Sequence, residues 1–196
     1  MLTIKNKKVK ILVLANLMLS VTLFFSGCSI TPDKEGHSGF LFNKDLREVK
    51  VYFTKSKKSD ELLFITAARK VSKDDSAVSA ALKELFLGPT KSEELMGIMT
   101  EIPIGTRLIK VEESEDEVLV DLSSQYLTGG GSAAMQLRYL QIYKTLKKLC
   151  PNKEIYLNVE GKSLKTIGGE GLEVSQPIKN INDYTKKYEK TKDLQP

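Results

Sequence analysis

Histidine, cysteine and tryptophan are almost missing from this sequence of 196 residues, which has one His, two Cys and no Trp. The single histidine and the two widely spaced cysteines exclude a His/Cys zinc site with its usual ligand number. Catalytic sites of the Ser-His-Asp and Cys-His kinds need a histidine in the folded part of the chain. His37 instead lies between Pro32 and Gly39, in a stretch without periodicity, where we expect a solvated side chain.

A basic domain is also missing, although the formal net charge is +5. Residues 1–27 hold four lysines and no acidic residue, and without them 26 basic groups face 25 acidic ones. The chain therefore lacks the basic surface that nucleic-acid binding requires. With 41% hydrophobic residues, its composition is that of one globular domain with appendages.

The N-terminal 27 residues have the pattern of a signal peptide. Lys5–Lys10 form a basic segment, and Ile11–Phe25 is a nearly unbroken apolar run. A membrane-spanning helix needs about 20 apolar residues, so this run is too short to span a bilayer and has the length of a signal sequence.

The residues that end this run, Phe25-Ser26-Gly27-Cys28, resemble a bacterial lipobox, in which a small residue precedes a cysteine that receives diacylglycerol. The resemblance implies cleavage after Gly27 and a lipidated, palmitate-bearing Cys28, although Phe25 stands where leucine is usual. Two acyl chains suffice for stable attachment, here to the outer face of the cytoplasmic membrane. An ordinary signal peptide, or an uncleaved anchor with a chance cysteine, is the alternative.

Composition and periodicity divide the chain into a signal peptide (1–27), a flexible tether (28–48), one folded domain (49–178) and a polar tail (179–196) that we expect to be disordered. Alternating apolar residues predict strands at 49–54, 62–71, around 109–111, 118–122, 155–159 and 164–167. Two helices are predicted, and residues 90–105 are interpreted as an irregular link. The element order predicts an α+β fold, a small, mainly antiparallel sheet covered on one face by two helices.

Each predicted helix has a start and a stop signal. The first lies between Asp74-Asp75-Ser76 and Gly88-Pro89, and the second between Gly129-Gly130-Gly131-Ser132 and Pro151, with Ser132 as the expected cap. The expected apolar side of the second helix carries Met135, Tyr139, Ile142, Tyr143, Leu146 and Leu149. Its expected solvent side carries Arg138, Gln141, Thr145 and Lys148. In the third strand, Ile109 and Val111 are expected to face inward.

The triglycine loop, Gly129, Gly130, Gly131 and Ser132, is the candidate ligand site of the sequence. Main-chain N–H groups at a helix start can hold an anion. The loop lacks the lysine of a phosphate-binding P-loop, and the alternative is a turn that needs positive φ before a helix.

Other reactive side chains are interpreted as structural. Cys150 is expected to be a half-buried thiol rather than a nucleophile, and Asp121 a carboxylate that organises the turn after its strand rather than a base. The acidic residues from Glu112 to Glu117 crowd one hairpin turn, where solvated charges are expected. These residues predict no catalytic set, no metal site and no cofactor.

Motifs distributed over the domain, in order and spacing, resemble a GerMN domain, the module of GerM-type sporulation and spore-germination lipoproteins. They are Val51-Tyr52-Phe53, Leu87-Gly88-Pro89-Thr90, Ile102-Pro103-Ile104-Gly105-Thr106, Val120-Asp121-Leu122-Ser123-Ser124, Gly129-Gly130-Gly131-Ser132, Tyr143-Lys144-Thr145-Leu146, Val159-Glu160-Gly161-Lys162 and Gly168-Gly169-Glu170-Gly171-Leu172. The resemblance implies a fold similar to ring-building motifs, a non-enzymatic role, and association through sheet edges and helix faces.

Two classes of function follow. The first is a lipid-anchored, extracytoplasmic interaction module of a sporulation or spore-germination envelope complex, whose partners are membrane lipid through Cys28, envelope proteins and, as an open alternative, further copies of the chain. The second is a ligand-binding lipoprotein that recognises cell-wall fragments or anionic groups through the triglycine loop.

Overall fold

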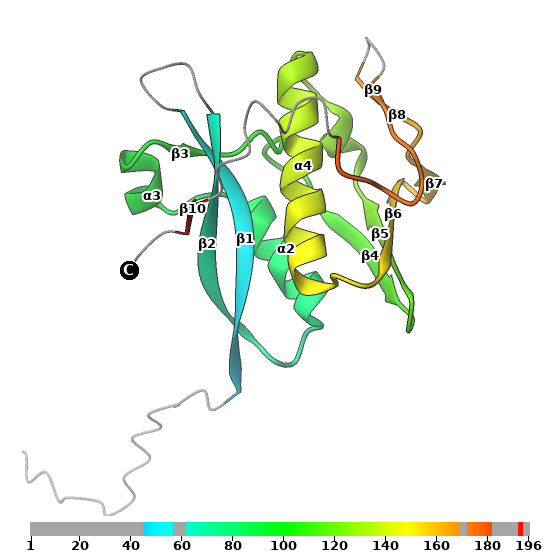
Figure 1. Ribbon diagram of the computed structural model, residues 1–196, viewed down its shortest axis with the longest axis horizontal. Coiled ribbons are helices and arrows are strands. Elements are labelled where there is room, and N and C mark those ends of the chain that lie inside the picture. Colours follow the sequence, from blue (N-terminus) through cyan, green and yellow to red (C-terminus); the bar gives the residue numbers. More distant parts are fainter. Residues whose placement is uncertain (1–44, 57–61, 169–171, 182–191, 194–196) are drawn as a thin grey trace, which may run out of the picture. The chain divides into compact units, whose positions relative to one another are not determined.

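The computed structural model describes residues 45–56, 62–168, 172–181 and 192–193, which lie in one compact unit, Asn43–Pro196 (Figure 1). The predicted signal peptide, its Cys28 and the predicted tether up to residue 44 lie outside the described residues. Most of the predicted polar tail lies outside them too. These assignments stay predictions, except that residues 46–48 of the predicted tether belong to a strand, and so do Lys192 and Asp193 of the predicted disordered tail.

The first sheet is a long hairpin with two short flanking strands. β1 (Leu46–Ser56) and β2 (Leu62–Ser72) pair antiparallel along their whole length. β3 (Ile98–Met99) adds antiparallel to β1, and β10 (Lys192–Asp193) adds parallel to β2. Burial alternates along β1 between residues 48 and 53, which confirms the predicted half-buried strand.

The second sheet also has four strands. β4 (Leu108–Glu113) and β5 (Glu117–Leu122) form an antiparallel hairpin, as predicted. β6 (Glu154–Val159) runs parallel to β5, and β7 (Lys162–Ser163) returns antiparallel to β6. The inward faces of β5 and β6 are buried at alternate positions, in agreement with the sequence periodicity.

β4 contains an irregularity that the sequence pattern did not reveal. Its register against β5 shifts between Leu108 and Lys110, so Ile109 is the extra residue of a β-bulge. Ile109 is 48% exposed, whereas Leu108 and Val111 pack against the core. The prediction that Ile109 and Val111 share the inward face is therefore wrong, because a bulge interrupts the two-residue alternation of side chains.

The first predicted helix is confirmed. α2 (Ala77–Leu87) is capped by Ser76, whose side chain accepts from the N–H of Ser79, and ends at Gly88 with φ of 83°. Positive φ at the residue after the last turn favours glycine, which explains why the helix stops there.

The predicted irregular link contains two regular elements. α3 (Lys91–Leu95) begins with a capping box, in which the Thr90 side chain and the Glu93 carboxylate satisfy each other's main-chain N–H groups. β3 follows and pairs with Thr54 and Lys55 of β1. One helical turn and two strand residues are too short to produce a hydrophobic period, so their signals were missed.

α4 (Ser132–Leu149) begins one residue earlier than predicted, because Gly131 occupies the cap position and Ser132 is the first helical residue. Gly131 makes no side-chain cap. Ser132 as the cap is therefore wrong. The helix ends at Leu149 with Cys150 as its C-cap, directly before Pro151, as predicted.

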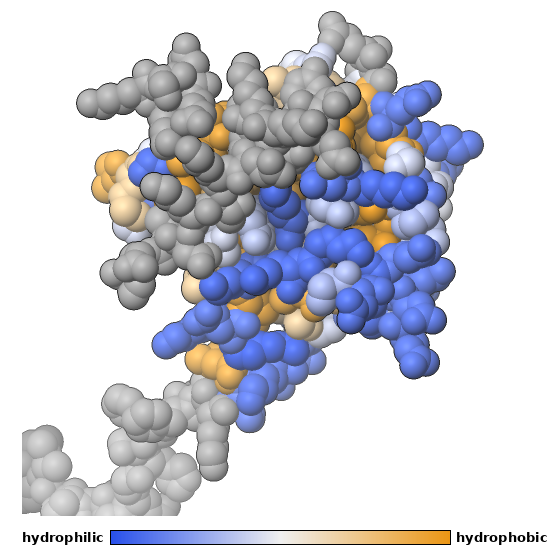
Figure 2. Space-filling view, in the orientation of Figure 1, coloured by the Kyte–Doolittle hydropathy of each residue, from blue (hydrophilic) through white to orange (hydrophobic). Residues whose placement is uncertain are grey.

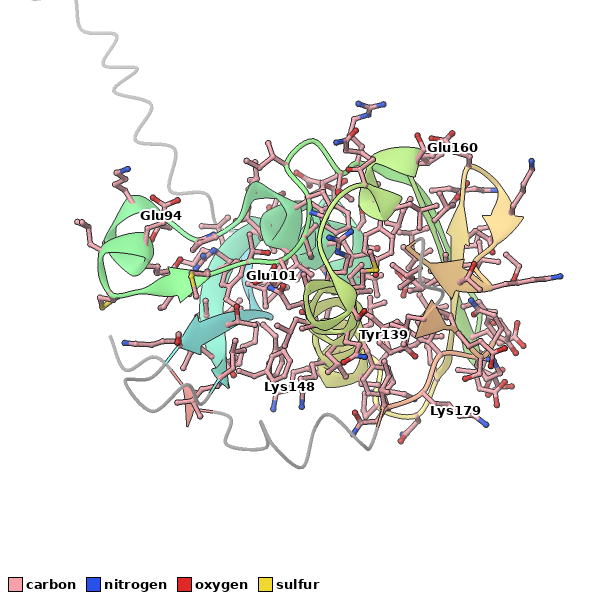
Figure 3. All side chains as sticks on the ribbon, turned by 90° about the horizontal axis from the view of Figure 1, so that it is seen from above. Glu94, Glu101, Tyr139, Lys148, Glu160 and Lys179 are labelled. Carbon is pink, nitrogen blue, oxygen red and sulfur yellow. The ribbon has the colours of Figure 1, made fainter. Side chains whose placement is uncertain are left out.

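Three side chains predicted on the solvent side of α4 are buried. Arg138 is 2% exposed, and Gln141 and Thr145 are 0% exposed, while Lys148 is exposed as predicted (Figure 3). Figure 1 shows the reason, since α4 lies between the two sheets instead of covering one of them. A helix with neighbours on both sides has little solvent-facing surface, so its polar residues need partners inside the protein.

The α+β class and the mainly antiparallel pairing are confirmed, with the strands divided between two four-stranded sheets and one ribbon. The ribbon consists of β8 (Thr166–Ile167) and β9 (Leu172–Glu173). α2 and α4 lie between the two large sheets, and the core forms from the surfaces that these layers share (Figure 1).

Two glutamines protect strand edges inside the fold. Gln141 donates to the carbonyl of Tyr52 in β1 (3.0 Å), while Thr145 accepts from the N–H of the same residue (3.1 Å). Gln176 likewise accepts from the N–H of Leu157 in β6 (3.1 Å) and donates to its carbonyl (3.0 Å). These side chains therefore satisfy main-chain groups as a neighbouring strand would.

Candidate functional site

Of the two sites predicted from the sequence, the structure describes only the triglycine loop. Gly129 and Gly130 have φ of 64° and 82°, and Gly131 is extended. The guanidinium of Arg138 lies inside the loop and donates to the carbonyls of Tyr126 (2.9 Å), Thr128 (3.0 Å) and Gly129 (2.9 Å).

The arrangement around Arg138 explains why position 130 is a glycine. A Cβ on Gly130 would lie 2.7 Å from a terminal nitrogen of Arg138, so a side chain there would displace the guanidinium. The loop is therefore wrapped around a cation that belongs to the protein, which gives it a structural role. Ligand binding by the loop stays a prediction.

Burial also changes the titration of the groups around this loop. It lowers the pKa of Arg138 and raises the pKa of the Tyr126 hydroxyl, whose side chain is 0% exposed. Both shifts follow from loss of water, so they report a tightly packed interior.

Asp121 stabilises the turn after β6 rather than the turn after its own strand, β5, as was predicted. Both of its carboxylate oxygens accept from the N–H of Gly161 at 3.0 Å, in the turn after β6. In the opposite direction, the carboxylate of Glu160 accepts from the N–H of Ser124 after β5 (2.8 Å). The two strands are parallel, so their carboxyl ends are adjacent and each turn stabilises the other.

The Cys150 thiol is free and 9% exposed, and burial raises its pKa. A raised pKa keeps the thiol protonated and weakly reactive, in agreement with the predicted structural role. The described residues include no group of three or more His, Cys, Asp or Glu side chains that could hold a metal ion. Among the same residues, none of the helices is long and apolar enough to cross a bilayer.

The most unusual surface of the described residues is apolar and lies around α2, α3, β3 and the loop that leads to β4. Leu87 is 78% exposed, Leu95 is 83% exposed and Ile104 is 95% exposed, and Met96 and Met99 are nearly half exposed. Figure 2 shows hydrophobic surface at the left edge of the molecule, where Figure 1 places α3. Exposed aliphatic side chains that gather in one place indicate a binding surface.

Two adjoining hollows run through this surface and share Phe86 and Leu87. We call them together the apolar groove. One part continues toward Ile98, Met99, Ile102 and Ile104, and the other toward Lys83, Arg107 and Leu108. The groove can accept apolar side chains of a partner, with cationic groups at one of its ends.

A buried ion pair holds α3 against the first sheet beside the groove. Arg69 of β2 binds both carboxylate oxygens of Glu93, at 2.9 and 2.6 Å, and its guanidinium stacks over the ring of Phe53. Burial raises the pKa of Glu93, but hydrogen bonds from Arg69 and Thr90 outweigh this effect, so the net pKa lies below 4.5. The exposed Leu95 and Met96 are thus carried by a rigidly attached helix.

Sequence reasoning did not find the apolar groove. The signal available was three short apolar groups around residues 87, 95–96 and 102–104, each separated by polar residues.

Figure 3 shows Glu94, on α3, at the opposite end of the folded unit from Glu160. The α3 end of the groove is therefore distant from the turns that Asp121 and Glu160 organise, whereas its other end, at Arg107, is hydrogen-bonded to Ser123.

Comparison with known families and structures agrees with this fold. A family model described as "Germane: Sporulation and spore germination" matches residues 50–165. No match is found among curated proteins.

Solved structures of GerMN domains are similar to the chain. The tandem GerMN domains of the sporulation protein GerM from Bacillus subtilis align with a TM-score of 0.54 and 18% identity, over 70% of this chain and 46% of that one. The first GerMN domain of the same protein aligns with a TM-score of 0.54 and 16% identity, over 68% of this chain and 98% of that one. The chain thus spans about half the length of the tandem structure and corresponds to one GerMN fold.

Proposed function

The chain belongs to the Germane family of sporulation and spore germination, and from this premise we propose that it is a lipid-anchored, extracytoplasmic interaction module of an envelope complex. In this proposal the domain binds another protein of the complex and carries out no chemical reaction.

The observation that carries the proposal is the apolar groove. Leu87, Leu95 and Ile104 are each more than three-quarters exposed, although a soluble surface is not stabilised by large aliphatic side chains in water. Leu87 and Ile104 line the groove, and Leu95 follows the lining residue Glu94 on α3, which is an arrangement expected for docking of a partner's side chains.

Three buried charged groups support a non-catalytic role because each binds main-chain or charged partners within the fold. Arg138 holds three carbonyls of the triglycine loop, Asp121 holds the turn after β6, and Glu93 pairs with Arg69. A group that is occupied in this way is not free to bind a substrate.

Attachment to the membrane is supported by the sequence alone. The lipobox-like residues before Cys28 predict two acyl chains, and residues 29–44 separate that cysteine from the described domain. The groove would then act close to the membrane surface.

Photo-cross-linking of the full chain in the membranes of sporulating cells tests the groove. A photoreactive residue placed at Ile104 is expected to form a discrete adduct with one protein, and the same residue at Leu46 is the control. Leu46 is also an exposed apolar residue, at 40%, but it lies at the start of β1 outside the groove. Equal adducts from both positions, or none from Ile104, would contradict the proposal.

The anchor is tested separately by Cys28→Ala. We expect the wild-type chain in the membrane fraction and the variant either in the soluble extracytoplasmic fraction or retained with an uncleaved signal. A variant that is processed and membrane-bound like the wild type would show that Cys28 is not the site of attachment.

A further inference from the structure

The edges of the two four-stranded sheets are protected unequally. The edge strands β3, β10 and β7 have two residues each, and Gln141 and Gln176 cover main-chain groups of β1 and β6 beside them. Within the described part of the chain, β4 is the one edge strand of these sheets with six residues. A long edge strand offers a row of N–H and C=O groups to another strand.

The turn after β4 shows which of these groups face outward. The N–H of Ser114 donates to the carbonyl of Glu117 at 2.9 Å, so these two residues form a hydrogen-bonded pair. Hydrogen-bonded and non-hydrogen-bonded pairs alternate along an antiparallel ladder. Glu112 and Lys110 therefore direct their main-chain groups toward β5, and Val111 directs its N–H and C=O away from the sheet.

When two copies of β4 pair with each other, one register places every charged side chain at positions 110 and 112 opposite a charge of the other sign. When two copies pair antiparallel with Val111 opposite Val111, Lys110 of each copy lies opposite Glu112 of the other. Shifting the register by two residues in either direction instead places Glu112 against Glu112 or Lys110 against Lys110. A parallel arrangement in register also brings like charges together, and opposed like charges destabilise a strand pair.

From this edge and its charge pattern we propose that β4 pairs with β4 of a second copy of this chain, antiparallel, about a twofold axis through Val111. The result is one continuous sheet of eight strands across two copies. Each copy has a single β4 edge, and the pairing occupies it. No further copy can add through the same edge, so the assembly is a closed dimer. Leu108, the first residue of β4, lines one end of the apolar groove, but Val111, the centre of the proposed pairing, does not. The inference does not depend on the proposed function.

The contact is expected to be weak in solution. Lys110 and Glu112 already contact each other within one chain, and both side chains are more than half exposed, so exchanging partners changes the energy only modestly. The bulge at Ile109 also limits the regular ladder on one side.

The proposal is tested by reversing the charges at positions 110 and 112. Sedimentation velocity of the full chain in detergent, over a wide range of concentration, measures how much of each variant is a dimer. We expect a concentration-dependent dimer. Lys110→Glu and Glu112→Lys each convert two attractive cross-strand pairs into repulsive ones and should weaken the dimer about tenfold. The double variant Lys110→Glu/Glu112→Lys restores complementarity and should dimerise like the wild type.

Three outcomes would overturn the inference: a monomer at every concentration, a dimer that neither single variant weakens, or a double variant as weak as the singles. Thermal unfolding of each variant verifies folding, which exposed charge changes should leave intact. Leu87→Ser, in the apolar groove, should leave the dimer unchanged. If the wild-type chain forms the dimer but gives no cross-linked adduct from Ile104, the proposed function is refuted and the inference about β4 is not.

Discussion

In most proteins, charged side chains are exposed and large aliphatic side chains are buried. The triglycine loop departs from this rule because it surrounds the buried charge of Arg138, and the apolar groove departs from it because its aliphatic side chains are exposed. Around the loop, a charged side chain is 2% exposed and binds three carbonyls. Around the groove, three large aliphatic side chains are more than three-quarters exposed. A buried polar group with partners stabilises the fold, whereas exposed apolar groups contribute little to it and are available for binding. The comparison predicts large stability effects at the first region and small ones at the second.

The largest effect is expected from Arg138→Met, which keeps the apolar stem but removes the donors to three carbonyls, of which that of Tyr126 is buried. We expect a loss of about 3 kcal/mol in the free energy of unfolding, measured by urea denaturation. Lys148→Met, on the exposed side of the same helix, is the control and should change stability by less than about 0.5 kcal/mol. Equal stability of the two variants would remove the structural role assigned to Arg138.

Glu93→Gln, at the ion pair that holds α3 beside the groove, should cost about 2 kcal/mol at neutral pH. The folded pKa of Glu93 lies below the unfolded value of 4.5, so its contribution is complete above that pH and is lost as pH falls through the folded pKa. Wild-type stability should therefore decrease more steeply under acid than that of the variant.

The matched control for this measurement is Glu94→Gln. Glu94 is 52% exposed and lies 3.4 Å from Lys91, an exposed pair that contributes little. Identical acid dependence of the wild type and Glu93→Gln would show that the carboxylate of Glu93 is not coupled to folding.

Substitutions of two adjacent glycines in the triglycine loop should change the free energy of unfolding by different amounts. Gly130→Ala introduces a Cβ against Arg138 at a positive φ and should cost about 1 to 2 kcal/mol. Gly131→Ala has open space and a φ of −88°, so it should be neutral within about 0.5 kcal/mol. Thermal unfolding of the two variants is sufficient, and a neutral Gly130→Ala would show that the loop accommodates a side chain.

The smallest effect on stability is expected in the apolar groove. Leu87→Ser should change the free energy of unfolding by less than about 0.5 kcal/mol while removing the adduct at Ile104. Leu85→Ala, two residues earlier on the same helix and 0% exposed, should cost about 3 kcal/mol. A comparable loss from both variants would mean that Leu87 serves the core rather than a partner.

Much of the fold could be predicted because local physics decides it. The alternation in β1, β5 and β6 and the cap and stop of α2 each involve neighbours in sequence. α3 and β3 were missed because they are too short for a period, and the inward position of Ile109 was wrong because a bulge leaves no mark on composition. The triglycine loop was recognised, but its occupant, Arg138, was placed in solvent.

The order of the two long helices and of the long strands, the boundaries of those helices to within a residue or two, and the motifs of the family follow from the chain read residue by residue. Backbone geometry, capping and side-chain periodicity act over a few positions, so they are present in the sequence itself. Which polar residues of α4 are buried was decided only when the two sheets packed on either side of that helix. Which aliphatic residues of α3 stay exposed was decided by how α3 attaches to the first sheet. Burial depends on what arrives from distant parts of the chain, and no local pattern contains that information.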